Sequence, residues 1–169
     1  MYTSTQKIAE QGLALNQLLA QWRFATHTIV MTNGCFDLLH LGHVDYLERA
    51  RALGHKLVVA LNDDDSIRRL KGPSRPIQSL EARSRILAAL ESVDLVISFA
   101  EETPIELIRL VRPHVLVKGA DYRPEAVVGA NELPDWGGRL ELLSFVEGQS
   151  TTNLVQKMRE AERTEEARN

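Results

Sequence analysis

The chain has 169 residues and a formal net charge of -3 at pH 7, with 44% hydrophobic and 25% charged residues. This composition is ordinary for a globular protein and excludes a disordered chain, a collagen-like repeat and a disulfide scaffold. The near-neutral charge argues against a general nucleic-acid binder. No apolar stretch reaches the ~18 residues of a membrane span, and a lone cysteine without a visible signal peptide predicts a cytoplasmic protein.

The first elements follow from hydrophobic spacing and turn residues. Apolar residues at roughly helical spacing predict an amphipathic helix over residues 5–21, within an N-terminal helical extension over 1–27. The β-branched run 28–32 predicts a buried strand that ends at an Asn-Gly pair. A helix is expected over about 40–53, and Gly54 is placed to cap its C-terminus.

Strands and helices alternate through the rest of the chain. Further strands are expected over 56–61, 94–99, 115–117 and 139–143, and further helices over 79–91, 103–111 and 151–162. Residues 71–76 contain two prolines and a glycine and predict a loop, as do residues 129–138, with at most one helical turn. Residues 163–169 are expected to be a disordered tail. The alternation predicts a single α/β domain over 1–169, with a Rossmann-like parallel sheet covered by helices on both faces.

Polar clusters follow four of these strands, where ligands of open α/β sheets bind. They lie at 33–43, 62–63, 118–121 and 150–152. In the first cluster, His40 and His43 are three residues apart and share one face of the expected helix's first turn, a position suited to phosphates. An ordinary helix start is one alternative, and a zinc site lacking a third ligand is a weaker one. The phosphate-binding loop of P-loop enzymes and the dinucleotide fingerprint are both absent.

The pattern G-x-F-D-x-x-H-x-G-H over residues 34–43 resembles the signature of the cytidylyltransferase-like nucleotidyltransferases, which share an α/β fold. The runs RRLKGPSRPI, VLVKGADY and GGRLELLSFVEGQSTT narrow the resemblance to adenylyltransferases that make ADP-heptose. It extends from about Lys7 to Met158. It implies that D-glycero-β-D-manno-heptose 1-phosphate attacks the α-phosphate of ATP, which releases pyrophosphate in lipopolysaccharide core biosynthesis.

The resemblance also implies roles for individual residues. The expected catalytic residues are His40, His43, Lys71 and Lys118. The expected nucleotide- and substrate-binding residues are Asn33, Gly34, Cys35, Phe36, Asp37, Gly42, Asn62, Asp63, Arg83, Gly119, Asp121, Ser150, Thr151 and Thr152. No protein metal site is expected, because Mg²⁺ would be carried on the nucleotide phosphates.

Several of these assignments have structural alternatives. Each lysine could be a solvated surface charge, Arg83 a helix-surface residue, and Ser150 a plain helix cap. By similarity Asp121 could hold either a sugar hydroxyl or the metal. Lys71 lies in a Gly/Pro loop that is suited to closing over a substrate.

Two other functions compete with heptose adenylylation. A glycerol-3-phosphate cytidylyltransferase is one, although Phe145-Val146 and Gln149 stand where those enzymes usually have Arg-Thr and Ile. A non-enzymatic nucleotide-binding regulator on the same fold is the other. The expected partners are ATP and heptose 1-phosphate, without nucleic acid or membrane, in a homodimer or larger homo-oligomer. The length leaves no room for the sugar kinase domain that often accompanies such enzymes, so a stand-alone form is expected.

Overall fold

The computed structural model describes residues 3–144 together with Val155 and Glu160. Its strands form one parallel sheet in the order β1-β4-β3-β2-β5-β6. Their bounds are β1 Ile8–Ala9, β2 Ile29–Gly34, β3 Lys56–Asn62, β4 Leu95–Phe99, β5 Val115–Gly119 and β6 Arg139–Leu143. The predicted Rossmann-like α/β fold is therefore confirmed.

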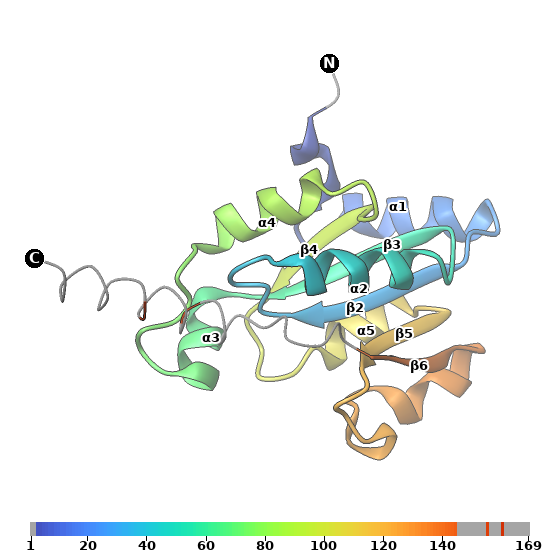
Figure 1. Ribbon diagram of the computed structural model, residues 1–169. Helices are drawn as coiled ribbons and strands as arrows, with labels where there is room; N and C mark the ends of the chain where they lie inside the picture. The colour runs from blue at the N-terminus through green and yellow to red at the C-terminus, as the bar shows by residue number, and fades with distance from the viewer. Residues whose placement is uncertain (1–2, 145–154, 156–159, 161–169) are drawn as a thin grey trace, which may run out of the picture.

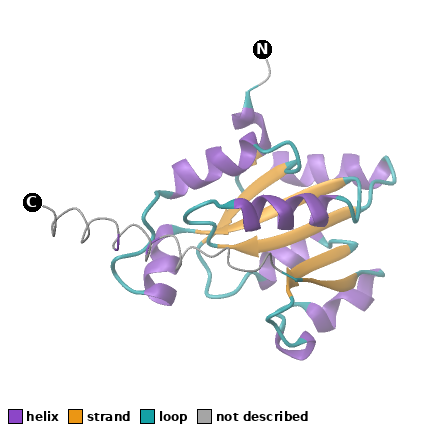
Figure 2. Ribbon diagram, in the orientation of Figure 1, coloured by secondary structure: helices purple, strands orange, loops and turns teal. Residues whose placement is uncertain are grey.

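Helices cover both faces of this sheet (Figures 1 and 2). The α-helices are α1 Leu13–Phe24, α2 Leu41–Arg51, α3 Asp64–Lys71, α4 Leu80–Ala89 and α5 Ile105–Val111, and the 3₁₀ helices are Ser4–Lys7, Pro124–Ala126 and Ala130–Trp136. Core contacts place α1 and α5 on one face, and α2 and α4 on the other. None of the helices in the described part of the chain is long and apolar enough to cross a bilayer.

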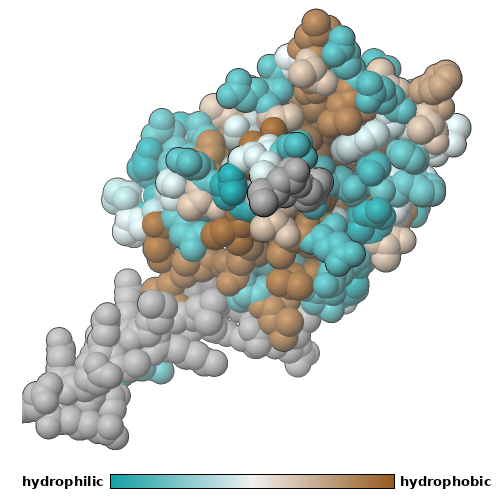
Figure 3. All heavy atoms as spheres, turned by 90° about the horizontal axis from the view of Figure 1, so that it is seen from above, coloured by the Kyte–Doolittle hydropathy of each residue, from teal (hydrophilic) through white to brown (hydrophobic). Residues whose placement is uncertain are grey.

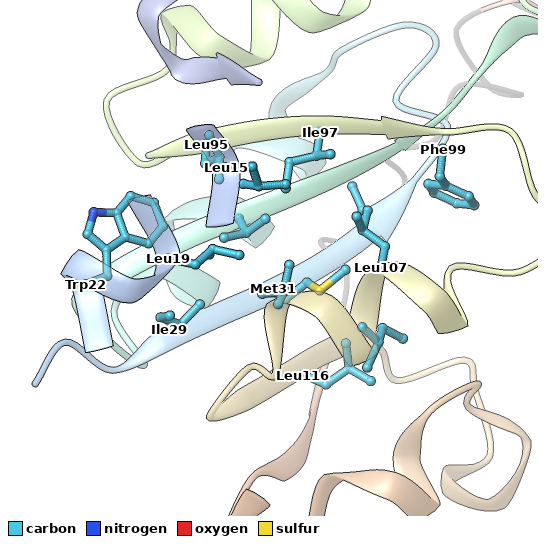
Figure 4. Packing of buried hydrophobic residues seen from close by; sticks show 14 of the residues in the cluster. Leu15, Leu19, Trp22, Ile29, Met31, Leu95, Ile97, Phe99, Leu107 and Leu116 are labelled. Carbon is cyan, nitrogen blue, oxygen red and sulfur yellow. The ribbon is translucent and has the colours of Figure 1, made fainter. Parts of the chain in front are cut away.

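Alternating residues of β2 enter two separate cores. Ile29 and Met31 pack with α1 and α5, as Figure 4 shows, whereas Val30 packs with α2 on the other face. All three side chains are fully buried, which stabilises the fold by roughly 1.5–3 kcal/mol for each. On the surface in Figure 3, hydrophobic side chains lie among hydrophilic ones rather than covering the face.

The strand order reverses direction at β2, which has β3 on one side and β5 on the other. The connections from these two strands therefore diverge, and a crevice opens at their carboxyl ends. Asn33 and Gly34 end β2, and Lys118 and Gly119 end β5. Two of the predicted polar clusters thus meet at this switch point.

The N-terminal prediction is wrong for residues 5–12. Ile8 and Ala9 form the edge strand β1, which pairs with Val96 and Ile97, and α1 begins only at Leu13. Gly12 precedes it with a φ of 157°, a conformation that other residues adopt rarely. The predicted helix therefore spans three elements, the 3₁₀ helix Ser4–Lys7, β1 and α1, of which only the last is an α-helix.

Two other local predictions need correction. Residues 64–71, for which the sequence analysis gives no helix, form α3, and the Asp63 side chain caps this helix by accepting a hydrogen bond from the Ser66 amide. Gly54 does not cap α2, which ends at Arg51. A Cβ at Gly54 would lie 2.6 Å from Val30 Cγ2, so this glycine permits close packing against β2 instead.

The remaining predictions differ in outcome. The Ser79 side chain caps α4 as predicted, by accepting a hydrogen bond from the Ala82 amide. The region 129–138 contains the 3₁₀ helix Ala130–Trp136, which is longer than the single turn allowed for it. Most of the predicted helix 151–162 and all of the tail 163–169 lie outside the described residues.

Candidate active site

A cavity of about 220 Å³ opens at the switch point. It is lined by Asn33, Gly34, Cys35, Phe36, Asp37, His43, Tyr46, Lys71, Lys118, Gly119, Asp121 and Tyr122. Ten of these residues were predicted from the sequence as site residues. The loop after β2, the start of α2, the end of α3 and the segment after β5 therefore contribute to one cavity wall.

The loop between β2 and α2 is shaped by tight packing. Phe36 has a φ of 45°, an uncommon value for a residue with a side chain. A Cβ on Gly34 would lie only 3.0 Å from the Phe36 ring, so the glycine makes room for that ring. The Phe36 ring in turn contacts His43, with 5.1 Å between ring centroids. The glycine thus helps to set the place of a predicted catalytic side chain.

His40 and His43 stack with ring centroids 3.9 Å apart. The His40 carbonyl accepts a hydrogen bond from the His43 amide at 2.9 Å, which closes the first turn of α2. The buried Nδ1 atoms of both rings have no hydrogen-bond partner within the described structure. Gly42, which lies between the two histidines in the sequence, is buried. The predicted juxtaposition of the two imidazoles is therefore present at the helix N-terminus.

The histidines are held in their neutral forms. Burial lowers the pKa of His43 to about 4, assisted by the positive charges that His40 and Lys71 can carry. Burial also lowers the pKa of His40. At neutral pH both imidazoles of the free protein are therefore uncharged, and each has one N–H to donate. A phosphate brought against them would favour the protonated forms.

Two lysines supply cationic groups to the same cavity. Lys118 is 9% exposed, and its burial lowers its pKa to about 8, although Asp121 and Cys35 act in the opposite direction. The Lys118 ammonium lies 5.2 Å from the centre of the Tyr122 ring. Lys71 is exposed at the last residue of α3. The loop prediction for Lys71 is therefore wrong in detail, because a helix presents it.

A second lobe of about 420 Å³ adjoins the first cavity. The two lobes share Asn33, Gly34, Cys35, Lys71, Lys118 and Tyr122 as walls. The rest of the second lobe comes from Asn62, Leu70, Glu102, Thr103, Pro104, Ala126, Val127 and Val128. Lys71 and Lys118 therefore border both lobes.

Asn33 carries a further sign of a ligand. Its Oδ1 atom is buried and has no hydrogen-bond partner in the described part of the chain. Because buried polar atoms are nearly always paired, such an acceptor fits a donor on a bound molecule. Asn33 lines both lobes, so that donor would belong to a ligand at their junction.

Three predicted binding residues make structural contacts. The Asp37 carboxylate accepts from two backbone amides and pairs with Arg75. The Arg83 side chain donates to backbone carbonyls and pairs with Asp64. It is fully buried and is therefore not a helix-surface residue. Neither lobe has Arg83 in its wall. Asp63 caps α3. Of these three, the structure brings only Asp37 to the cavity.

Among the polar residues of the two walls, sequence reasoning missed four, namely Tyr46, Tyr122, Glu102 and Thr103. Two of them had a readable signal. Tyr46 lies three residues after His43, and therefore on the same helix face, where its hydroxyl is 2.8 Å from Thr32 Oγ1. Tyr122 directly follows the predicted Lys118–Asp121 cluster. Glu102 and Thr103 reach the site only because β3 and β4 end at the same edge.

Some predictions cannot be placed. Ser150, Thr151 and Thr152 lie outside the described residues. Within the described ranges, no group of three or more His, Cys, Asp or Glu side chains is arranged to hold a metal ion.

Comparison with known proteins identifies the family. The profile described as cytidylyltransferase-like matches residues 31–167. The chain belongs to the cytidylyltransferase-like family. Its curated relatives include the bifunctional protein HldE of Magnetococcus marinus, 52% identical over 93% of this chain and 32% of the relative. HldE of Syntrophotalea carbinolica is 54% identical over 86% of this chain and 30% of the relative. The chain thus spans about a third of the curated relatives it matches.

A solved structure of similar fold extends this comparison. The lipopolysaccharide core biosynthesis protein from Thermoplasma volcanium superposes with a TM-score of 0.60 and is 26% identical, covering 73% of this chain and 99% of that chain. These findings confirm the predicted fold and the predicted family of nucleotidyltransferases. They also agree with the resemblance to the adenylyltransferases that make ADP-heptose.

Proposed function

We propose that this chain transfers AMP from ATP to D-glycero-β-D-manno-heptose 1-phosphate, giving ADP-heptose and pyrophosphate. The observation that carries the proposal is the convergence of His43, Lys71 and Lys118 on one cavity at the switch point. The HldE relatives and the lipopolysaccharide protein of similar fold support the choice of a heptose phosphate as acceptor. We also infer that the reaction takes place in the cytoplasm.

The reaction forms one bond and breaks another at the α-phosphorus. An oxygen of the sugar phosphate attacks it, and the bond to the bridging oxygen of pyrophosphate breaks. Such a transfer needs little covalent help from a protein, so positioning and charge neutralisation supply most of the catalysis. Mg²⁺ carried on the nucleotide would neutralise part of the triphosphate charge.

The residues of the cavity divide this work. His43 on the cavity wall, and His40 stacked against it, would donate imidazole N–H groups to the triphosphate at the start of α2. The helix N-terminus favours the same negative charge. Lys71 and Lys118 stand between the lobes, where the two anionic substrates meet. Both ammonium groups therefore reduce the repulsion between nucleophile and triphosphate.

The second lobe supplies groups suited to a sugar. Glu102, Thr103 and Asn62 offer a carboxylate, a hydroxyl and an amide, which can exchange hydrogen bonds with sugar hydroxyls. Asp121 lies on the wall of the first lobe, where its exposed carboxylate can accept from a sugar hydroxyl or face nucleotide-bound Mg²⁺.

A pyrophosphate-release assay tests the proposal directly. ATP and CTP are each combined with heptose 1-phosphate and with glycerol 3-phosphate. We expect release only with ATP and heptose 1-phosphate. Release only with CTP would reject the adenylyltransferase, and no release with any pair would favour a nucleotide-binding regulator.

A further inference from the structure

Lys71 lies in the middle of a chain segment that leaves the sheet after β3 and returns at α4. This segment, residues 64–78, consists of α3 and the loop that follows it; we term it the Lys71 strap. In Figure 1, α3 lies beyond the sheet at the arrowhead end of β2. Because Lys71 is exposed and flexible in side chain, its position depends on how the two ends of the strap are held.

A single buried cation holds both ends. Arg83 Nη2 pairs with Asp64 at 2.7 Å, at the first residue of the strap. Arg83 Nε donates to the carbonyl of Gln78 at 3.1 Å, at the last residue. Arg83 Nη1 donates to the Cys35 carbonyl at 2.8 Å and to the Asn62 carbonyl at 2.9 Å. The guanidinium therefore ties the strap to the loop after β2, where the nucleotide is expected.

A buried carboxylate holds the returning end a second time. Asp37 Oδ1 accepts hydrogen bonds from the amides of Ile77 and Gln78, at 2.8 and 3.0 Å. Asp37 Oδ2 pairs with Arg75 at 3.1 Å, and the Asp37 side chain is 1% exposed. Hydrogen bonds to charged groups are the strong ones, particularly where water is excluded. The returning end thus has three polar contacts to one residue of the nucleotide loop.

We propose that Asp37 and Arg83 are positioning residues that place Lys71 against the bound triphosphate by fixing both ends of the strap to the loop Cys35–Asp37. Lys71 is close enough to His43 to act on it electrostatically, because the positive charge of Lys71 contributes to the lowered pKa of the His43 imidazole. The contact of Lys71 with a triphosphate rests on the proposed function, whereas the anchoring of the strap is a property of the fold. Neither Asp37 nor Arg83 needs to touch substrate to act in this way.

A double-mutant cycle tests the proposal, because positioning through Lys71 must vanish when Lys71 is absent. Asp37→Asn and Arg75→Met both weaken the Asp37 anchor at the returning end of the strap, and each is combined with Lys71→Ala. In the full-length protein with Lys71, we expect either anchor variant to weaken nucleotide binding and kcat/KM by about tenfold. In the Lys71→Ala background, we expect the same variant to cost less than about twofold.

Asp94→Asn is the matched control. Asp94 also accepts from a backbone amide, that of Leu57, and pairs with Arg51, but it lies at the amino ends of β3 and β4. We expect its variant to lower the melting temperature without changing nucleotide affinity in either background. Arg75 is 17% exposed, so Arg75→Met provides a folded test should Asp37→Asn fail to fold.

Nucleotide binding is measured by calorimetry with ATP and then with CTP, which requires no acceptor. If an anchor variant lost the same factor in nucleotide affinity with and without Lys71, the positioning role would be overturned and a purely structural one would be left. In a second outcome, the anchor variants weaken nucleotide binding only when Lys71 is present, but heptose 1-phosphate is not turned over. That result would reject heptose 1-phosphate as the acceptor and support the anchoring of Lys71. A wild-type chain that binds neither nucleotide would overturn both proposals, since Lys71 would then have no phosphate to meet.

Discussion

At the scale of residues, the site combines groups whose charge depends on what is bound. His43 is neutral in the free protein because burial lowers its pKa to about 4, and burial likewise lowers the pKa of Lys118 to about 8. A buried site that is only partly charged avoids some of the desolvation penalty while empty. The arriving phosphates would then restore the positive charge where it is needed.

His43 is the first residue to test. Replacing it by alanine removes a donor expected to stabilise the charge that develops at the α-phosphate. We expect kcat to fall by at least ~10²-fold in the pyrophosphate-release assay. His55→Ala is the control, because His55 accepts a hydrogen bond from the Thr28 amide away from the cavity. Unchanged turnover in His43→Ala would remove that residue from the mechanism.

Lys118 predicts a pH dependence. Its ammonium form is populated below a pKa of about 8 and is lost as the pH rises through that value. Because kcat/KM reports the free enzyme, we expect it to decline above about pH 8, whereas kcat should decline at higher pH once phosphate is bound. Lys118→Arg should remove this decline from the pH–rate profile. A wild-type kcat/KM that is flat from pH 7 to 9 would contradict the role.

At the residue level, the sequence motifs point to side chains that line the cavity. His43, Lys71 and Lys118 were selected because they match the motifs of the family, and all three are on the cavity wall. Their catalytic roles stay predictions. Asp37 and Arg83 matched the same pattern, yet their contacts depend on residues about 40 to 48 positions away, which no local spacing encodes. A motif thus marks a residue as belonging to the site without telling whether it faces the ligand or the protein.

At the scale of elements, α3 shows why a capping residue and a binding residue are hard to separate by sequence. Asp63 follows a strand, as a ligand-binding residue would, but its side chain caps α3 at 2.7 Å from the Ser66 amide. Asparagine and aspartate are equally good acceptors in that position. The capping role and the ligand-binding role of Asp63 can therefore be separated by a substitution that removes the negative charge and keeps the capping oxygen.

We expect Asp63→Asn to leave both stability and nucleotide affinity nearly unchanged. Asp63→Ala should lower the free energy of unfolding by about 1 kcal/mol, because the Ser66 amide loses its acceptor. Urea denaturation measures the first quantity and calorimetry with ATP the second. A marked loss of ATP affinity in Asp63→Asn, with stability retained, would assign the carboxylate to the ligand instead.

Element prediction failed mainly where an element is short. β1 has two residues and α3 has eight, so neither contains enough periods to be distinguished from its flanking segments. β1 exists because β4 offers it an edge, which is a long-range condition. The longer strands β2 and β3 were predicted nearly to their ends, since buried β-branched and aliphatic runs leave little ambiguity.

At the scale of the whole molecule, alternation of strands and helices was enough to predict the architecture. The strand order was not predicted, because sequence spacing does not say which strands become neighbours. That order decides the site, since it sets β2 beside β5 and so unites two distant polar clusters. The Ser150–Thr152 prediction lies outside the described residues, and the homo-oligomeric state stays a prediction.

Ligand linkage offers a test at this scale. A nucleotide that binds only the folded chain stabilises it by about 2.7 kcal/mol at a concentration 100 times its Kd. For a chain of this size we expect ATP at that concentration to raise Tm by about 5–10 °C in thermal unfolding. CTP at the same concentration should raise it less. An equal or larger shift with CTP would contradict the adenine preference.

The wall shared by the two lobes has a consequence for inhibitor design. Lys71 and Lys118 border both lobes, so a molecule that joined a nucleoside to a sugar through a phosphate chain would meet both cations at once. Tethering makes the second contact intramolecular, which raises its effective concentration without any new interaction. Affinity should then depend steeply on linker length, and the best length would measure the distance between the lobes.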